Sequence, residues 1–232
     1  SDTESKIDYL QSYVRTYIKE EIQLEQTVRH LDPFRSFLEI AAQRNGKILN
    51  FSKIHRDVGA SVKTIQSYYQ ILEDTHLGFF VPGFHESWRK QLSQAPRFYF
   101  FDTGVTRALA RQIQIELSES TFEFGNLFEQ FVICECFRMN EYLNKEYKFS
   151  YLRTKDGAEI DLIIDRPGLK RVLLEIKSSK SIQAEDIPHI IHFHKEFSKT
   201  EAYCVSLDPH PKVISGVHCL PLANVLKSIG LS

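Results

Sequence analysis

The segment GAEIDLIIDRPGLKRVLLEIKSSK, residues 157 to 180, constrains the fold most strongly, because apolar residues recur at every second position on both sides of a turn. Pro167 and Gly168 favour the turn, so the flanking segments should fold back as antiparallel strands about Gly168. This register forms three apolar pairs on one face: Ile160 with Ile176, Leu162 with Leu174, and Ile164 with Val172. The sequence therefore predicts a β-hairpin with a buried apolar face.

The other face of this hairpin carries charged residues. Asp161 falls opposite Glu175, and Lys177, two residues farther along, lies on the same face. Directly opposed side chains have Cβ atoms roughly 4.5–5.5 Å apart, so two carboxylates there repel by several tenths of a kcal/mol or more. A divalent cation would remove that repulsion. The face is therefore either a solvent-exposed surface or a metal site.

A metal site of this kind would suit phosphodiester chemistry. Mg²⁺ commonly takes one or two carboxylates together with waters and phosphate oxygens. It would lower the pKa of a bound water and stabilise charge on phosphorus, while Lys177 would orient or help to deprotonate the attacking water. The apolar helix predicted from TFEFGNLFEQFVICECFRMNEYLNK carries Glu129, the best-placed additional carboxylate. We therefore predict Glu129, Asp161 and Glu175 as metal ligands, and Asp161, Glu175 and Lys177 as catalytic residues.

The first part of the chain shows three short helices followed by an apolar strand, FFVPGF. Asp32 and Gly46 should delimit the first helix, Ser52 and Gly59 the second, and Ser61 should cap the third. A tight turn between the second and third helices and a trailing strand are typical of a helix-turn-helix with a wing. The sequence therefore predicts a winged-helix domain.

The third of these helices would present a set of polar side chains outward: Lys63, Thr64, Gln66, Ser67 and Gln70. Such side chains either contact phosphates and base edges of DNA or form the exposed face of a packing helix. The formal net charge of −1 provides no overall basic field, so nucleic-acid binding would require a local basic patch.

Bulk composition narrows the class of protein. Of the 232 residues, 42 % are hydrophobic and 25 % are charged, as in ordinary soluble proteins. No apolar run reaches the roughly 18 residues of a membrane span, and the four cysteines are scattered, which favours a reducing cytoplasm. His189, His192 and His194 form either a metal site or an exposed helix face. We predict a cytoplasmic protein with no membrane partner.

The second half of the sequence predicts the order α-β-β-β-α-β with a final β-α, that is, a mixed sheet flanked by helices. We predict four parts. They are a terminal helix in residues 1–30, the winged helix in 31–90, a connecting strand and helix in 91–120, and an α/β domain in 121–232.

The set of Asp161 followed by Glu175-Ile176-Lys177 resembles the PD-(D/E)XK nuclease-like fold over roughly residues 121–207, although Ile160 stands in place of the proline. A helical glutamate such as Glu129 is a recurring extra ligand in that superfamily. Nearly the whole chain resembles the C-terminal half of a bacterial and archaeal AAA-type ATPase family. The segments that carry this resemblance are YLQSYVRTYIKEEI, PRFYFFDTGV, GNLFEQFV and LRTKDGAEIDLII…LLEIKSS.

In that ATPase family, a P-loop ATPase domain precedes a winged helix and a nuclease-like domain of unknown function. The resemblance implies that the opening helix is the end of the ATPase domain. It also implies that ATP binds only through that upstream domain, because this chain has no G-x-x-x-x-G-K-[ST] sequence. The expected function is DNA binding with Mg²⁺-dependent phosphodiester hydrolysis. The alternatives are a non-catalytic module that docks DNA or protein for the ATPase domain and a regulatory role with a protein partner or a second copy of the chain.

Overall fold

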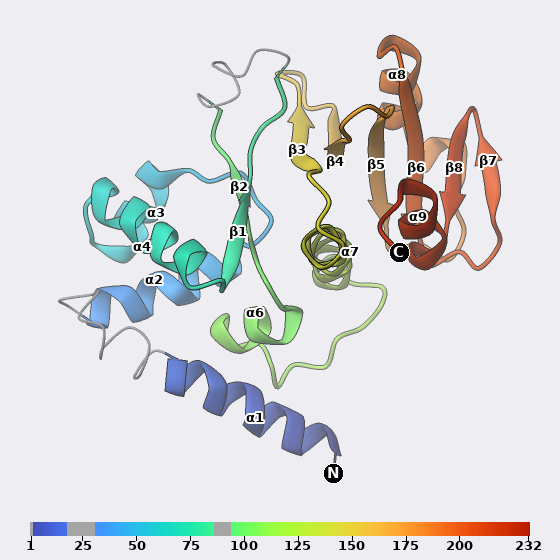
Figure 1. The fold of residues 1–232 in the computed structure, drawn as a ribbon. Coiled ribbons are helices and arrows are strands. Elements are labelled where there is room, and N and C mark those ends of the chain that lie inside the picture. The colour runs from blue at the N-terminus through green and yellow to red at the C-terminus, as the bar shows by residue number, and fades with distance from the viewer. Residues whose placement is uncertain (1, 18–30, 86–93) are drawn as a thin grey trace. The chain divides into compact units, whose positions relative to one another are not determined.

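The computed structural model describes residues 2–17, 31–85 and 94–232 (Figure 1). The chain forms two compact units, Ser1–Phe80 with Arg97–Leu117 and Val81–Pro96 with Ser118–Ser232. The architecture is mixed α+β, with a two-stranded sheet in one part of the chain and a six-stranded sheet in another. Residues 18–30 of the predicted terminal segment and residues 86–93 at the end of the predicted winged helix lie outside the described residues.

The first unit contains helices followed by a pair of strands. Its elements are α1 (Asp2–Tyr17), α2 (Leu31–Gln43), α3 (Phe51–Val58), α4 (Val62–Asp74), β1 (Gly78–Val81), β2 (Arg97–Phe100) and α6 (Thr103–Leu109). Ser61 caps α4 as expected, because its side chain accepts a hydrogen bond from the backbone N–H of Thr64. Asn50 rather than Ser52 caps α3, and Asp32 lies within the first turn of α2. The helices therefore start slightly earlier than the sequence signals indicate.

The core of the first unit is aromatic. Phe37 is fully buried, and its ring centroid lies 4.8 Å from that of Tyr69 and 5.2 Å from that of Tyr68. Tyr69 in turn contacts Phe98 of β2 at 5.0 Å, mostly edge to face. Gly46 follows α2 with φ of 73°, and a Cβ there would lie 2.9 Å from Cε1 of Tyr99, so only glycine fits. These contacts join the helices to the paired strands.

The second unit is a six-stranded sheet with helices. Its elements are α7 (Phe122–Tyr142), β3 (Lys148–Arg153), β4 (Glu159–Asp165), β5 (Arg171–Lys177), a 3₁₀ turn (Ala184–Asp186), α8 (Pro188–Glu196), β6 (Thr200–Ser206), β7 (Lys212–Ile214), β8 (Val217–Leu220) and α9 (Leu222–Ile229). The strand order is β3-β4-β5-β6-β8-β7. The strands β3, β4 and β5 are antiparallel neighbours, and β5, β6 and β8 run parallel. The mixed sheet is confirmed, with β7 as an additional edge strand.

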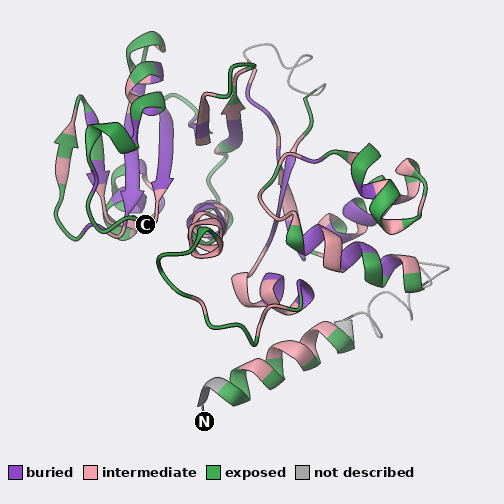
Figure 2. Cartoon of the chain, turned by 180° about the vertical axis from the view of Figure 1, so that it is seen from behind, coloured by how far each residue is buried: buried purple, intermediate pink, exposed green. Residues whose placement is uncertain are grey.

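The β4–β5 hairpin has the predicted register. Leu162 pairs with Leu174 and Ile164 with Val172, but the ladder ends before the predicted third pair, Ile160 with Ile176. All six residues of the predicted apolar face are buried. The opposite face is covered as well, because Ile163 and Leu173 are fully buried in a cluster that includes α8 residues. Figure 2 shows these central strands as buried. On that face Glu175 is buried, whereas Asp161 and Lys177 remain partly exposed.

Candidate functional site

The strands β4 and β5 separate at Asp161. Their pairing runs from Ile164–Val172 to Leu162–Leu174, and beyond this point the N–H of Ile176 donates to Oδ2 of Asp161 at 2.8 Å. A carboxylate thus takes the place that a backbone carbonyl would have in a regular ladder. β5 continues along β6 to Lys177, so its last residues are still held on one side. This divergence fixes Asp161 beside the end of β5.

Glu175 is the central residue of the site. It is only 5 % exposed, and its Oε1 lies 2.7 Å from Nζ of Lys177. Its Oε2 is buried and has no hydrogen-bond partner among the residues that the structure describes. An unpaired buried polar oxygen is costly, and in native structures such an atom calls for an explanation, which can be an ion or a catalytic role.

The charges in the site act strongly on one another. Burial and the charge of Asp161 raise the pKa of Glu175 to about 8, although Lys177 opposes this effect. Burial lowers the pKa of Lys177, but the charge and hydrogen bond of Glu175, with the charge of Asp161, outweigh burial and raise it. The site therefore needs positive charge to keep both carboxylates ionised at neutral pH.

The structure brings together Asp161, Glu175 and Lys177 but does not add Glu129 to them. Glu129 lies on α7, a helix that contacts β5, and its side chain is half-buried. Within the described residues, no group of three or more His, Cys, Asp or Glu side chains is arranged to hold a metal ion. The same holds for the histidines of α8, of which His192 faces Glu196 at 3.4 Å and His194 contacts Thr200 at 3.0 Å.

The sequence patterns did not predict two neighbours of Glu175, namely Glu159 and Cys204. Glu159 also raises the pKa of Glu175, and its position two residues before Asp161 was a usable signal for the shared face. Cys204 pairs with Glu175 across the parallel strands β5 and β6. No sequence pattern reveals that contact, because the two strands are joined through α8 and only the folded sheet aligns them.

The predicted nucleic-acid residues of α4 lie on its outward side. Lys63, Gln66, Ser67 and Gln70 are exposed, and Thr64 is half-buried. Much of their hydrogen-bonding capacity is used within the helix. The hydroxyl of Ser67 donates to the carbonyl of Lys63, and Nε2 of Gln70 donates to two neighbouring carboxylates, those of Glu73 and Asp74. The face is accessible, but acidic residues adjoin it.

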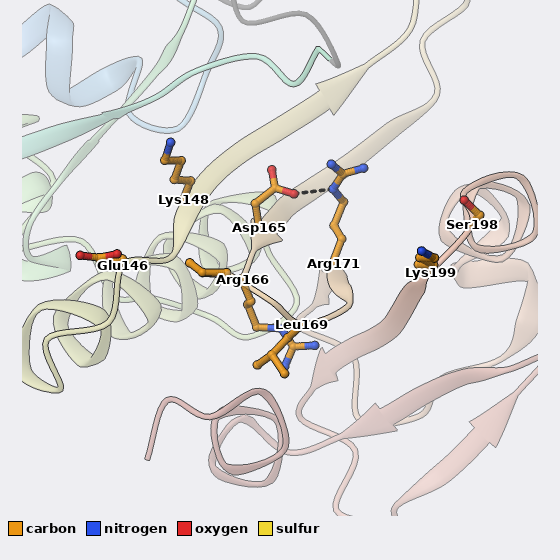
Figure 3. A pocket seen from close by; sticks show the side chains of 9 residues that line it. Glu146, Lys148, Asp165, Arg166, Leu169, Arg171, Ser198 and Lys199 are labelled. Carbon is orange, nitrogen blue, oxygen red and sulfur yellow. Dashed lines mark hydrogen bonds and ion pairs between the residues drawn. The ribbon is translucent and has the colours of Figure 1, made fainter.

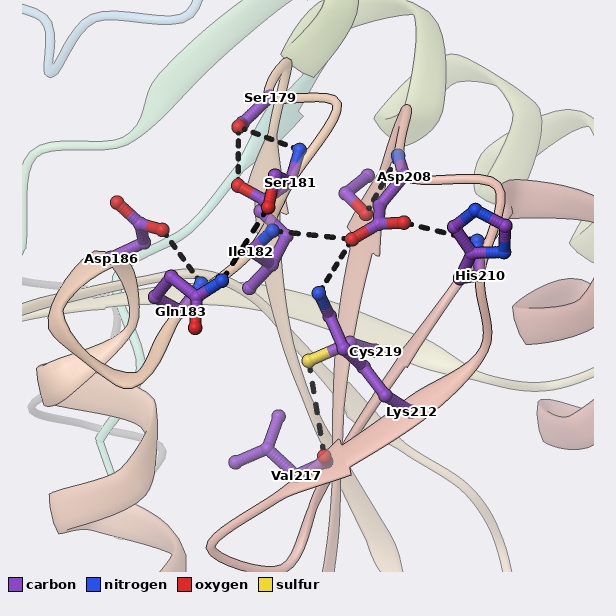
Figure 4. Close-up of polar contacts among 11 residues, drawn as sticks. Ser179, Ser181, Ile182, Gln183, Asp186, Asp208, His210, Lys212, Val217 and Cys219 are labelled. Carbon is purple, nitrogen blue, oxygen red and sulfur yellow. Dashed lines mark hydrogen bonds and ion pairs between the residues drawn. The ribbon is translucent and has the colours of Figure 1, made fainter.

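A second buried carboxylate lies in the loop after β6 (Figure 4). Asp208 is 4 % exposed and accepts hydrogen bonds from the N–H groups of Ile182 at 3.2 Å and His210 at 3.0 Å. Nζ of Lys212 lies 2.6 Å from its Oδ2. The hydrogen bond from Lys212, together with the backbone donors, lowers the pKa of Asp208 to about 2. This carboxylate is fully engaged in holding the loop.

Comparisons with known proteins identify two domains. A family model described as a domain of unknown function (DUF8612) matches residues 1–116, half of the chain. A second model, described as a domain of unknown function (DUF4143), matches residues 124–225. Domains of the second kind occur together with AAA-like ATPases. No curated protein and no solved structure matches the chain. None of the described helices is long and apolar enough to cross a membrane.

Proposed function

The chain belongs to the DUF8612 family, and we propose that its second unit is a Mg²⁺-dependent, nuclease-like module that acts on DNA. The observation that carries this proposal is the buried Oε2 of Glu175, which lies beside Asp161 and Lys177 and has no hydrogen-bond partner among the described residues. The order α7-β3-β4-β5-α8-β6 supports an assignment to the PD-(D/E)XK nuclease-like fold. The order of α2, α3, α4 and β1 supports a winged helix in the first unit.

The residues of the site fit a divalent cation. Asp161 and Glu175 supply the oxygen ligands that Mg²⁺ prefers. A cation between them would offset the burial and the repulsion from Asp161, which together raise the pKa of Glu175. When bound, Mg²⁺ supplies stabilisation of charge on phosphorus and a more acidic water. Glu129 is the proposed additional ligand, because α7 lies against β5.

Lys177 has a separate role in this proposal. Its ammonium is held 2.7 Å from Oε1 of Glu175, yet its side chain keeps 36 % exposure and can be reached by a substrate. A fixed ammonium at this position would donate to a phosphate oxygen or orient the attacking water. Asp161 is held in turn by the N–H of Ile176, so the separation of β4 and β5 fixes the spacing of the three groups.

Cleavage of linear, branched and single-stranded DNA with Mg²⁺ or Mn²⁺ tests the proposal. We expect metal-dependent cleavage by the wild type and losses of about 100-fold or more in Asp161→Asn, Glu175→Gln and Lys177→Met. Lys180→Met is the matched control, because this exposed lysine lies three residues beyond Lys177. Mn²⁺ should also raise the thermal unfolding midpoint of the wild type but not of Glu175→Gln. The absence of both cleavage and a Mn²⁺-dependent shift would remove the proposal.

One observation favours a second candidate, a non-catalytic module that docks DNA or protein. Within the described residues no third metal-ligating side chain joins Asp161 and Glu175, and Lys177 already provides Glu175 with a counter-charge. Under this alternative, Lys177 and Glu175 form a structural ion pair. Substitution of either residue would then lower stability, while divalent cations would leave the unfolding midpoint of the wild type unchanged.

We further propose that this chain works with an AAA-type ATPase domain, and that ATP binds there. The resemblance to the C-terminal half of such ATPases and the co-occurrence of the second domain with AAA-like ATPases support this partner. The chain by itself should not hydrolyse ATP, because its sequence has no Walker A motif. ATP hydrolysis by the purified 232-residue chain would contradict this assignment.

A further inference from the structure

The turn end of the β4–β5 hairpin is rich in basic residues. Two hollows of about 410 and 550 Å³ flank the turn and share Arg166 and Leu169. The cationic side chains that line them, here called the basic rim, are Lys148, Arg166, Lys170, Arg171, Lys199 and Lys227. The acidic lining residues are Glu146, Asp165 and Glu201. This positive excess stands out in a chain whose net charge is −1, and it is the kind of local patch that polyanion binding requires.

Two arginines of the basic rim, Arg166 and Arg171, are held in place by hydrogen bonds to acidic or backbone groups (Figure 3). Nε of Arg171 donates to Oδ1 of Asp165 at 2.6 Å, and its guanidinium carbon lies 4.6 Å from the ring centroid of Phe84. Arg166 is 8 % exposed and donates to Oε2 of Glu201 at 2.7 Å and to the carbonyl of Lys170 at 2.7 Å. These contacts tie the turn to β5 and β6, so the hollows are held open by bonded side chains.

Three lysines of the basic rim remain available to a ligand. Lys170, Lys199 and Lys227 are exposed, and their ammonium groups form no ion pair within the described part of the chain. Leu169, at the turn between Gly168 and Lys170, is 61 % exposed. The turn therefore presents one exposed apolar side chain beside exposed lysines.

We propose that the basic rim binds the phosphate backbone of duplex DNA. Lysines on flexible stems suit backbone phosphates, and an apolar side chain at a hairpin tip suits contact with the bases in a groove. Asp165 lies roughly 13 Å from Asp161 along the same strand, so DNA held at the turn end is within a few nucleotides of the acidic site. The inference rests on the proposed DNA-directed function and names the surface through which the second unit holds its substrate.

Two other negatively charged partners, an anionic membrane and an acidic protein surface, would also be attracted by the lysines of the basic rim. An anionic membrane is disfavoured because a single exposed leucine buries little apolar area, and membrane-surface binding scales with that area. An acidic protein surface would use the lysines but would not need the exposed leucine. Duplex DNA uses both features, which is why we assign it to this surface.

Fluorescence anisotropy with a short labelled duplex in EDTA tests the inference, because binding is then measured without cleavage. We expect Lys170→Ala/Lys199→Ala/Lys227→Ala to weaken binding at least tenfold and to lower the slope of log affinity against log salt by about 3. The matched control is Lys47→Ala/Lys53→Ala, two exposed lysines that belong neither to the basic rim nor to the polar set predicted on α4, and it should keep the affinity of the wild type. Leu169→Ala should weaken binding to the duplex while leaving its salt slope unchanged.

The outcomes separate this inference from the nuclease proposal. Duplex binding that depends on the basic rim, with neither cleavage under any metal nor a Mn²⁺-dependent shift of the unfolding midpoint, would support the inference and rule out the nuclease proposal. Unchanged duplex binding by the triple variant, or an equal loss in the Lys47→Ala/Lys53→Ala control, would overturn the inference. It would also be overturned if the triple variant lost binding to phosphatidylserine vesicles or to a poly-glutamate peptide while its affinity for DNA stayed the same.

Discussion

Two buried carboxylates of the second unit, Asp208 and Glu175, behave in opposite ways. Both are nearly inaccessible, at 4 % and 5 % exposure. Asp208 receives two backbone N–H groups and the ammonium of Lys212, and its pKa falls to about 2. Glu175 has one lysine, a like charge beside it and an oxygen without a hydrogen bond, and its pKa rises to about 8. Burial alone therefore does not decide the charge state, and the number of donors does.

The contrast also separates a structural role from a functional one. The contacts of Asp208 close a loop and leave no capacity for a ligand within the described residues. Glu175 lies at the end of a strand and keeps a buried oxygen without a hydrogen-bond partner among the described residues, and the adjacent Lys177 side chain is 36 % exposed. A pKa raised by burial and a like charge, as in Glu175, is typical of a functional site. The fully hydrogen-bonded ion pair of Asp208 instead stabilises a loop.

The largest stability effect in this comparison should come from Asp208→Ala. The change leaves two backbone N–H groups and Lys212 without their acceptor, so the thermal midpoint at pH 7 should fall by roughly 5–10 °C. A lowered pKa contributes stability above the unfolded pKa of 3.8, which is lost as the pH falls toward 2. The gap between wild type and variant should therefore narrow in acid. A gap that widens below pH 4 would contradict the assignment.

Glu175→Gln should have the opposite sign. A carboxyl whose pKa is raised in the folded state gives stability below the unfolded pKa of 4.5, which is lost as the pH rises through about 8. The uncharged variant should therefore match the wild type near pH 5 and exceed it at pH 9, by a few kcal/mol at most, since one pKa unit corresponds to about 1.4 kcal/mol. Urea unfolding at both pH values measures this difference. A variant that is less stable than the wild type at pH 9 would break the comparison.

Two substitutions of Asp161 test whether the end of the β4–β5 pairing needs a charged carboxylate or only a hydrogen-bond acceptor for the N–H of Ile176. Asp161→Ala leaves the N–H of Ile176 unpaired and should cost about 1–3 kcal/mol in urea unfolding. Asp161→Asn keeps an oxygen acceptor and removes a like charge from Glu175, so it should cost less than the alanine variant. Equal losses in the two variants would show that the hydrogen bond to Ile176 contributes little.

The smallest effect should be that of Lys180→Met. This lysine pairs with Glu119, but both side chains are well exposed, at 69 % and 59 %. Exposed ion pairs contribute about 0–1 kcal/mol, and salt screens them. Urea unfolding in low and high salt should therefore separate wild type and variant only slightly. A larger loss than in Lys177→Met would mean that the loop after β5, rather than the buried pair, carries the electrostatic stability of this region.

Local sequence signals predicted the hairpin well, because the alternation and the Pro167–Gly168 turn specify one register. The same signals located Asp161, Glu175 and Lys177 together. They did not predict that α8 packs on Ile163 and Leu173, since α8 follows later in the chain and this packing is a tertiary contact. They also placed Glu129 as a ligand from its helix alone, and its approach to β5 remains a prediction.

The basic rim was invisible in the sequence for a related reason. Its lysines and arginines come from β3, the β4–β5 turn, the start of β5, the residue before β6, and α9, which are scattered along the chain. Only the sheet order brings these ends together. An overall net charge of −1 therefore gave no indication of a local positive surface.

The sequence by itself determined the hairpin, its pairs Leu162–Leu174 and Ile164–Val172, and the shared face of Asp161 and Glu175, because strand periodicity and turn chemistry are local. The tertiary structure alone decided that Glu175 is buried, that the N–H of Ile176 donates to Asp161, and that among the described residues Oε2 of Glu175 has no hydrogen-bond partner. It also decided that Asp208 accepts hydrogen bonds from two backbone N–H groups. The reason is physical. Desolvation and hydrogen-bond partners come from residues distant in the chain, and these set the charge state of a buried carboxylate.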